Sequence, residues 1–174
     1  MKRGIIILGS SNSKGETFKI SEFVSLQTGF PIIDLKTKVI LPFDYDFKNR
    51  HDDFFNLLEN IVENYDLLIF ATPVYWYTMS GTMKIFFDRL SDCLKIYKDT
   101  GRKLRTKEMA VISSGSDEEF KVGFHMPFIE TAKYLGIKYL ANAHCWDENL
   151  KVSNEKILNA FIFKLEIDEY RALS

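Results

Sequence analysis

The sequence predicts a three-layer α/β domain, in which a five-stranded parallel sheet carries helices on both faces. Short apolar runs alternate along the chain with segments of helical periodicity. A continuous apolar run is typical of a strand that is buried on both faces, and strict strand–helix alternation implies parallel pairing. The 174 residues are enough for one domain with a substantial core, and no linker, repeat or low-complexity tract divides them.

Five apolar segments are the predicted strands. The first, Ile5–Leu8, is β-branched and ends at Gly9. Pro31 favours an edge position for the second strand, because proline cannot donate to a sheet hydrogen bond. The predicted strands cover residues 5–8, 31–35, 66–71, 109–112 and 137–143.

A helix is predicted after each strand, from apolar side chains spaced three or four residues apart. Phe54, Leu58 and Ile61 illustrate such a stripe, and Gly29 and Gly136 are helix stop signals. The predicted helices cover about residues 17–27, 53–63, 82–94, 122–135 and 153–165, and residues 36–50 and 101–107 are predicted to be connections.

Composition indicates an ordinary soluble protein. Hydrophobic residues make up 46% of the chain and charged residues 27%, with a net charge of −1. This balance argues against nucleic acid or an anionic membrane as a partner, and no apolar run approaches the roughly 20 residues that span a bilayer. The apolar stretch that ends at Leu8 lacks a signal-peptide cleavage site.

The cysteines and histidines suggest neither a disulfide framework nor a metal site. Cys93 and Cys145 have no metal-ligand spacing, and a reducing cytoplasm is the expected compartment. His51, His125 and His144 are scattered, so each is interpreted as structural or as a surface residue.

The first strand leads into a loop of glycine and hydroxyl residues, Gly9–Thr17, which opens a helix. Amide groups at a helix N-terminus have no partner within the helix, and the helix dipole attracts an anion there. We therefore predict a phosphate site, with a plain strand-to-helix turn as the alternative. The loop matches neither G-x-G-x-x-G nor G-x-x-x-x-G-K-[ST], which argues against a Rossmann-type dinucleotide site and against an NTPase.

The third strand leads into a segment with three consecutive aromatic residues, Tyr75, Trp76 and Tyr77. A strand with one buried face does not explain three aromatic residues in a row, because adjacent strand residues face opposite ways. In a loop they would form a flat wall with polar edges, and a dimer interface or a small satellite of the core are the alternatives. In the strand order 2-1-3-4-5 this loop, the Gly9 loop and the loop at Ser114 converge at one edge of the sheet.

The loops resemble the signatures of the NADPH-dependent FMN reductase family of flavodoxin-like flavoproteins, which includes NAD(P)H:quinone reductases. The family's first loop looks like G-S-x-R-x-x-[SG]-x-T, and this chain has that spacing with Asn12 in place of the arginine. The second signature, P-x-Y-W-x-x-x-x-x-x-x-K-x-F-x-D-R, is matched closely from Pro73 to Arg89. Ser114–Ser116 resembles the third flavin loop, and the resemblance covers nearly the whole chain.

The resemblance implies a flavodoxin-like fold with FMN as the cofactor. The first loop would hold the phosphate, the second would line the isoalloxazine ring, and the third would close the ring's other edge. Lys84, Asp88 and Arg89 lie on the following helix and are interpreted as structural or interface residues. The implied FMN-binding residues are Ser10, Asn12, Gly15, Glu16, Thr17, Pro73, Val74, Tyr75, Trp76, Tyr77, Ser114, Gly115 and Ser116.

The implied activity is that of an oxidoreductase, in which FMN carries hydride from NADPH or NADH to a small acceptor such as a quinone or a flavin. No catalytic side chain is assigned. The alternatives are a flavodoxin-type electron carrier, which should be strongly acidic, and a non-catalytic flavin-binding module. The family also implies a homodimer, with the helix from Thr82 and the aromatic loop as its candidate interface. A related subgroup has a cysteine-bound iron–sulfur centre, which residues 36–50 exclude because they contain no cysteine.

Overall fold

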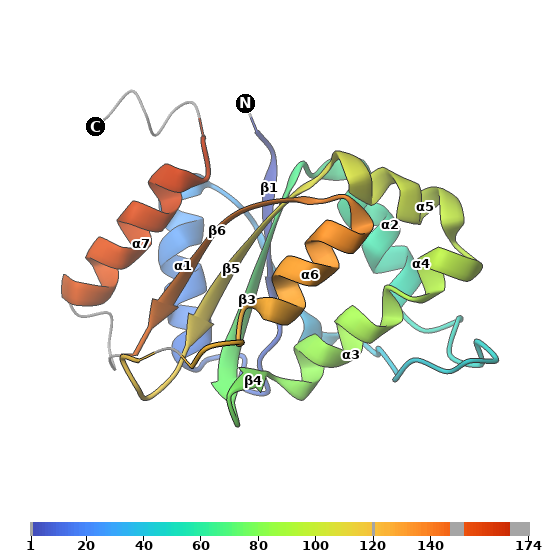
Figure 1. Ribbon diagram of the computed structural model, residues 1–174, viewed down its shortest axis with the longest axis horizontal. Coiled ribbons are helices and arrows are strands. Elements are labelled where there is room, and N and C mark those ends of the chain that lie inside the picture. The colour runs from blue at the N-terminus through green and yellow to red at the C-terminus, as the bar shows by residue number, and fades with distance from the viewer. Residues whose placement is uncertain (1, 120, 147–151, 168–174) are drawn as a thin grey trace.

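The computed structural model describes residues 2–119, 121–146 and 152–167, and its three-layer α/β architecture confirms the predicted fold class (Figure 1). The main strands run in the order β2-β1-β3-β5-β6 and are all parallel, which is the predicted order 2-1-3-4-5 once the short β4 is set aside. β4 pairs only with β3, in an antiparallel hairpin. The strands are β1 Gly4–Leu8, β2 Ile32–Asp34, β3 Leu67–Tyr75, β4 Thr78–Met79, β5 Glu108–Ser114 and β6 Lys138–Cys145.

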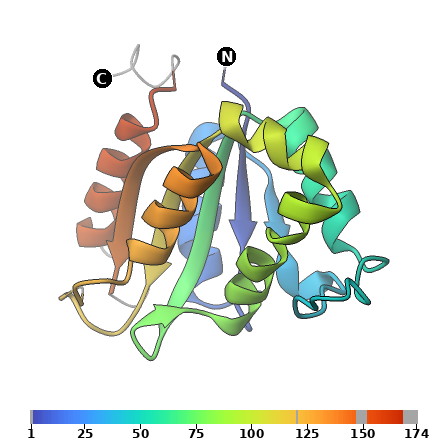
Figure 2. The same cartoon turned by 45° about the vertical axis from the view of Figure 1, so that its right-hand side comes forward.

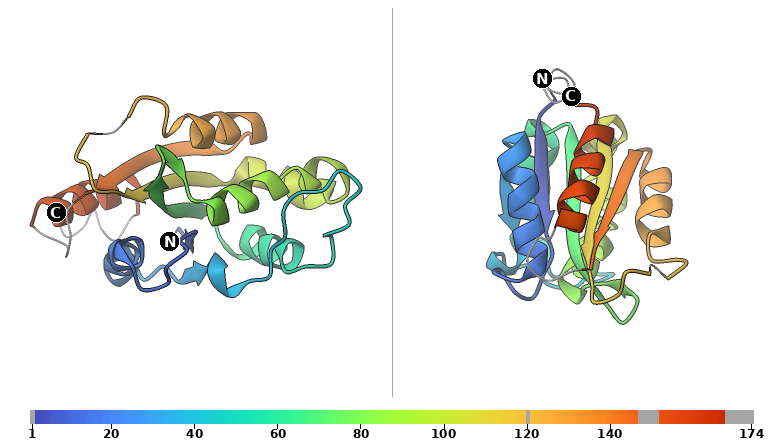
Figure 3. Two further views of the ribbon diagram at one scale, coloured as in Figure 1. Left: turned by 90° about the horizontal axis from the view of Figure 1, so that it is seen from below. Right: turned by 90° about the vertical axis from the view of Figure 1, so that its left-hand side faces the viewer.

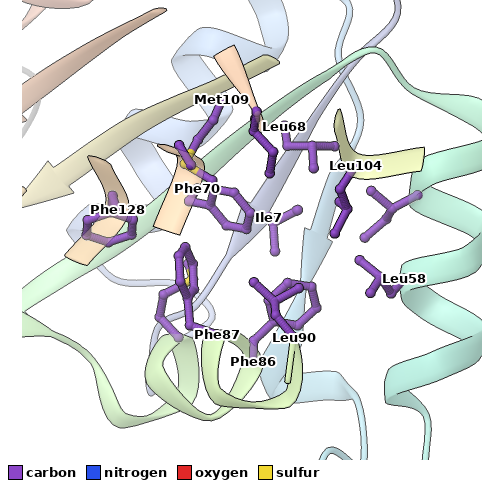
Figure 4. Close-up of a cluster of buried hydrophobic side chains, with 14 of the residues drawn as sticks. Ile7, Leu58, Leu68, Phe70, Phe86, Phe87, Leu90, Leu104, Met109 and Phe128 are labelled. Atoms are coloured by element: carbon purple, nitrogen blue, oxygen red, sulfur yellow. The ribbon is translucent and has the colours of Figure 1, made fainter. Parts of the chain in front are cut away.

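The sheet has a separate hydrophobic core on each face, because successive strand residues point to opposite sides. In β1, Ile5 and Ile7 belong to one core, and Ile6 and Leu8 belong to the other. The first core packs against α2, α3 and α6, and Figure 4 shows it around Phe70. The second core packs against α1 and α7, which share a face of the sheet (Figure 3).

The helices follow the predicted order, with three corrections. The helix predicted over 122–135 begins only at Met126, because residues 122–125 form the turn that precedes it. The predicted helix 82–94 is interrupted at Leu90 and Ser91, so that α3 and α4 are separate. The predicted connection 101–107 is instead helical, because Gly101 lets α5 pack against Cys93 at a distance that excludes a side chain. The α-helices are α1 Glu16–Thr28, α2 Phe54–Asn64, α3 Gly81–Arg89, α4 Asp92–Lys95, α5 Lys98–Lys103, α6 Met126–Leu135 and α7 Val152–Lys164, and the 3-10 helices are Leu35–Thr37 and Leu104–Thr106.

No helix in the described ranges is long and apolar enough to cross a membrane.

The long connection between β2 and α2 is tied to α3 by the buried side chain of Arg89. Only 1% of this residue is exposed to solvent, and its guanidinium forms ion pairs with Asp52 and Asp92. It also donates to the backbone carbonyls of Leu41, at 3.0 Å, and Asn49, at 3.2 Å. The structural interpretation of Arg89 is therefore confirmed, since all these partners lie within the scaffold.

Replacement of Arg89 by methionine is expected to lower the free energy of unfolding by about 3–5 kcal/mol, because it leaves two buried carboxylates without their cation. Urea unfolding measured by circular dichroism tests this expectation. Arg102→Met is the matched control, because Arg102 pairs with Asp99 on the exposed surface, where an ion pair contributes little. Equal effects of the two substitutions would contradict the role given to Arg89.

Candidate functional site

Three loops meet at the edge of the sheet where the parallel strands end (Figure 3). They follow β1, β3 and β5, which are neighbours in the sheet. Leu8, the last residue of β1, is paired with Ala71, which is paired with Ile112, so β1 ends shortly before β5, which ends at Ser114. This is the edge at which open α/β sheets bind their ligands.

The first loop is held in shape by its own polar side chains. The Ser10 hydroxyl accepts the N–H of Asn12 at 3.1 Å, and the Asn12 side-chain oxygen accepts the N–H of Lys14 at 3.1 Å. The arginine that is usual in the family at position 12 has no acceptor atom and could not make the second bond. Asn12 thus stabilises the loop through a contact of its own.

The start of α1 completes the first loop, where the sequence predicts an anion cradle. Gly15 is the N-cap and lies so close to Asn12 that a side chain at position 15 would crowd it. Glu16 opens the helix, and its carboxylate pairs with Lys19 at 2.6 Å, which offsets the negative charge beside the N-terminus. Within this first turn the N–H of Phe18 donates to the carbonyl of Gly15 at 3.0 Å, and the helix dipole favours an anion at this end.

Hydrogen bonds join the first loop to the other two. The Ser11 hydroxyl lies 2.9 Å from the Tyr75 hydroxyl, and the buried Thr17 hydroxyl lies 2.7 Å from that of Ser114. The Ser80 hydroxyl donates to the carbonyl of Gly9. Ser11 and Ser80 were not assigned from the sequence, because only the folded chain reveals partners so distant along it.

The aromatic segment forms a β-hairpin, which corrects the prediction of an irregular loop. Tyr75 is the last residue of β3, and Trp76 and Tyr77 form the two-residue turn to β4. At the base of the hairpin the Thr72 hydroxyl accepts the N–H of Ser80 at 3.0 Å. Figure 2 shows the hairpin projecting beside the loop that follows β5. The hairpin thus places aromatic side chains at the rim of the site.

A pocket of about 200 Å³ lies between the hairpin and the loop after β5. Five of its lining residues were predicted, whereas Pro73, Tyr75, Ser114 and the first loop do not line it. Among the residues that the structure describes, no group of His, Cys, Asp or Glu side chains could hold a metal ion. The pocket is lined by Val74, Trp76, Tyr77, Gly115, Ser116, Asp117, Glu119, Lys121, Phe124 and His144.

His144 is one of the pocket residues that the sequence interpretation missed, and the others are Asp117, Glu119, Lys121 and Phe124. His144 lies near the end of β6, where its Nε2–H donates to the carbonyl of Asp117 at 2.9 Å and its Nδ1 lies 3.0 Å from the Ser113 hydroxyl. Burial lowers the pKa of His144, so the ring is neutral near pH 7. A lone histidine carries no local signal, although its place beside the end of β5 could have suggested a role.

The residues present fit a ligand that has an anionic group at one end and a flat ring at the other. Gly115 lies so close to His144 that an added Cβ would be 3.2 Å from Cε1, and this glycine leaves the pocket floor open. Gly9 likewise lets the first loop approach Met83. Aromatic side chains on the hairpin and the ring of Phe124 supply apolar walls.

Comparisons with known proteins identify the family and the fold. The model of the NADPH-dependent FMN reductase family matches residues 2–126. YwqN of Bacillus subtilis, named as an NAD(P)H-dependent FMN-containing oxidoreductase, is 35% identical over 91 residues, which are 51% of this chain and 49% of that protein.

Two solved structures share the fold. The Trp repressor binding protein from Bacillus subtilis gives a TM-score of 0.74 at 24% identity, over 94% of this chain and 98% of that one. A flavodoxin, WrbA-like protein from Agrobacterium tumefaciens gives a TM-score of 0.68 at 15% identity, over 99% of both chains.

The fold and the position of the three loops define a flavodoxin-like α/β protein. Because the family model matches well over half of the sequence, the chain belongs to the NADPH-dependent FMN reductase family. FMN, with NADPH or NADH as electron donor, is the cofactor that this membership implies. The chain spans about half the length of the curated relatives it matches.

The stability of the protein is expected to fall as the pH decreases from about 6.5 to about 4. Burial lowers the pKa of His125 from 6.5 to about 4, and it also lowers the pKa of His144. Within this range the unfolded chain binds protons that the folded chain excludes, so acid favours unfolding.

Urea unfolding at pH 7.5 and pH 5.0 measures this dependence. Because the His125 ring is only partly buried, we expect it to contribute about 1 kcal/mol of the loss between these two pH values. His125→Gln should remove that part. If the variant lost as much unfolding free energy between pH 7.5 and pH 5.0 as the parent does, the contribution assigned to His125 would be wrong.

Proposed function

We propose that this chain is an FMN-dependent oxidoreductase that takes hydride from NADPH or NADH and passes it to a small acceptor such as a quinone or a flavin. The observation that carries the proposal is the hydrogen-bonded junction of three loops at one sheet edge. It joins an anion cradle, through Thr17 and Ser114, to a pocket with aromatic walls. Membership of the NADPH-dependent FMN reductase family supports the same conclusion.

The first loop and the start of α1 would hold the phosphate of FMN. Ser10, Asn12, Gly15, Glu16 and Thr17 form this end, where the helix dipole and the hydroxyl groups favour an anion. The buried Thr17 hydroxyl, through its contact with the Ser114 hydroxyl, links this end of the site to the loop after β5.

The hairpin and the loop after β5 would hold the isoalloxazine ring. The residues that would contact the ring come from the hairpin and from the end of β5 with its loop: Pro73, Val74, Tyr75, Trp76, Tyr77, Ser114, Gly115 and Ser116. Of these, Val74, Trp76, Tyr77, Gly115 and Ser116 line the pocket. When bound, FMN supplies the hydride chemistry. The protein contributes binding and orientation, and neutral His144 fixes the loop at Asp117 without adding a charge to the pocket.

FMN added to the purified protein should co-elute with it, and the flavin absorbance should bleach under anaerobic conditions with NADPH or NADH. A quinone added afterwards should restore the colour, because it reoxidises the flavin. A protein that takes up no FMN would contradict the proposal. A flavin that neither nucleotide bleaches would instead indicate a carrier or a binding module.

Gly115→Ala and Gly81→Ala form a matched pair for this assay. An added Cβ at Gly115 would crowd His144, whereas one at Gly81 meets no atom within 4 Å. We expect Gly115→Ala to weaken FMN binding about tenfold, because overpacking costs roughly 1–3 kcal/mol. Gly81→Ala should bind FMN as the parent does.

We also propose a cytoplasmic homodimer. The compartment is inferred from Cys93 and Cys145, which are both unbridged. The dimer contact is assigned to a groove of about 710 Å³ along α3 and α6, which includes Phe87, Leu90 and Tyr134. Tyr134 is 74% exposed there, and apolar surface of this kind is typical of contacts between identical chains.

Sedimentation velocity tests the dimer. The parent chain should sediment as a dimer, and Tyr134→Glu should shift it to the monomer, because a charge would then lie against the apolar groove. Tyr45→Glu is the control, since Tyr45 is similarly exposed but lies outside the groove. A monomeric parent at high protein concentration would disprove the proposal.

A further inference from the structure

The turn of the β3–β4 hairpin has a backbone that its residues do not favour. Trp76 has a φ of 48° and Tyr77 a φ of 67°, both in the left-handed region. Bulky L-residues are disfavoured there because Cβ approaches the carbonyl oxygen. Two-residue hairpin turns with positive φ at both positions are usually Asn-Gly. Local preference therefore does not explain a Trp-Tyr turn.

Packing within the chain does not compensate for this strain. Trp76 is 91% exposed and Tyr77 is 62% exposed, so both rings lie largely in water. Strained residues of this kind persist where the surrounding structure fixes them, and they cluster at ligand sites. Both side chains line the pocket, which gives them a location where a ligand could bury them.

The base of the hairpin is rigid, so the strained tip is held in place. Met79 is buried and pairs with Val74 across the hairpin. Ser80 caps α3 and donates to the carbonyl of Gly9, and Tyr75 contacts Ser11. The chain thus presents the Trp76 ring at a defined position on the rim of the pocket.

Exposure increases along the hairpin toward its tip. Val74 is half-buried, Tyr75 is 42% exposed and Trp76 is 91% exposed. Val74 and the half-buried Gly115 form the inner part of the site, where the flavin ring is proposed to lie. Trp76 lies at the outer rim, where its large ring can contact the edge of the flavin and also a second ring that enters after the flavin.

We propose that Trp76 is a specificity-determining residue that stacks on a second planar molecule, a fused-ring quinone in preference to a single-ring one. The indole is itself a fused ring, and stacking strengthens as the overlapping area grows. That this second molecule is the electron acceptor rests on the proposed function. In that reaction the quinone gains a hydride and a proton and leaves as the hydroquinone, and the nicotinamide leaves oxidised.

Three variants separate the ring from the strain. Trp76→Asn removes the ring and relieves the strain, because asparagine tolerates the left-handed region. Trp76→Phe keeps an aromatic ring and the strain. Phe47→Asn is the matched control, since Phe47 is another aromatic residue at positive φ, 56°, but does not line the pocket.

The measurements are the thermal midpoint and the ratio of kcat/KM for 2-methyl-1,4-naphthoquinone to that for 1,4-benzoquinone. Trp76→Asn should raise the midpoint by about 2–4 °C and lower the ratio about fivefold. Trp76→Phe should keep the midpoint and most of the ratio. Phe47→Asn should leave the ratio unchanged. An unchanged ratio in Trp76→Asn, or an equal fall in Phe47→Asn, would overturn the proposal.

Equilibrium dialysis measures the binding of 2-methyl-1,4-naphthoquinone without turnover. It uses the FMN-loaded protein, or the chain as purified if the chain takes up no FMN. Binding about fivefold weaker in Trp76→Asn than in the parent supports the stacking role, even if neither nucleotide reduces the protein. Equal binding overturns it. Nucleotide reduction therefore tests the proposed function, and quinone binding tests this inference separately.

Discussion

The parallel pairing of β3 with β1 on one side and with β5 on the other is the constraint on which the site depends. It brings the ends of three strands, distant in sequence, to one edge of the sheet. The short hydrogen bonds between these loops, such as that between the hydroxyls of Thr17 and Ser114, are possible only because the strands end at the same edge of the sheet. The buried apolar runs on both faces of the sheet maintain this register, since a slip by one residue would move each side chain to the wrong core.

Helix α3 fixes the position of the hairpin at the rim of the site, because the helix is anchored at both ends. At its start Ser80 caps the helix and bonds to Gly9 in the first loop. At its end the buried guanidinium of Arg89 holds the long connection at Leu41 and Asp52. The hairpin that precedes α3 therefore has a fixed base, and Trp76 can be held in an unfavourable conformation. Scaffold stability and site geometry are coupled through this one helix.

Much of the fold could be predicted because its signals are local. Continuous apolar runs such as Ile5–Leu8 indicated buried strands, and Gly29 and Gly136 marked helix ends, where both adopt a left-handed backbone. The helical residues around Gly101 were missed because glycine usually ends helices, whereas here it makes room for Cys93. The hairpin was missed because its turn lacks the residues that favour one.

The sequence by itself determined the order of the strands and helices, the three loops and the family. Apolar periodicity and short signatures depend only on residues that are close together in the sequence. Only the tertiary structure decided how the loops meet, that Asn12 supports its own loop, and that His144 lines the pocket. These features depend on contacts between residues far apart in the chain. The positive φ values of Trp76 and Tyr77 belong to the same group, because pairing of the flanking strands imposes them against local preference.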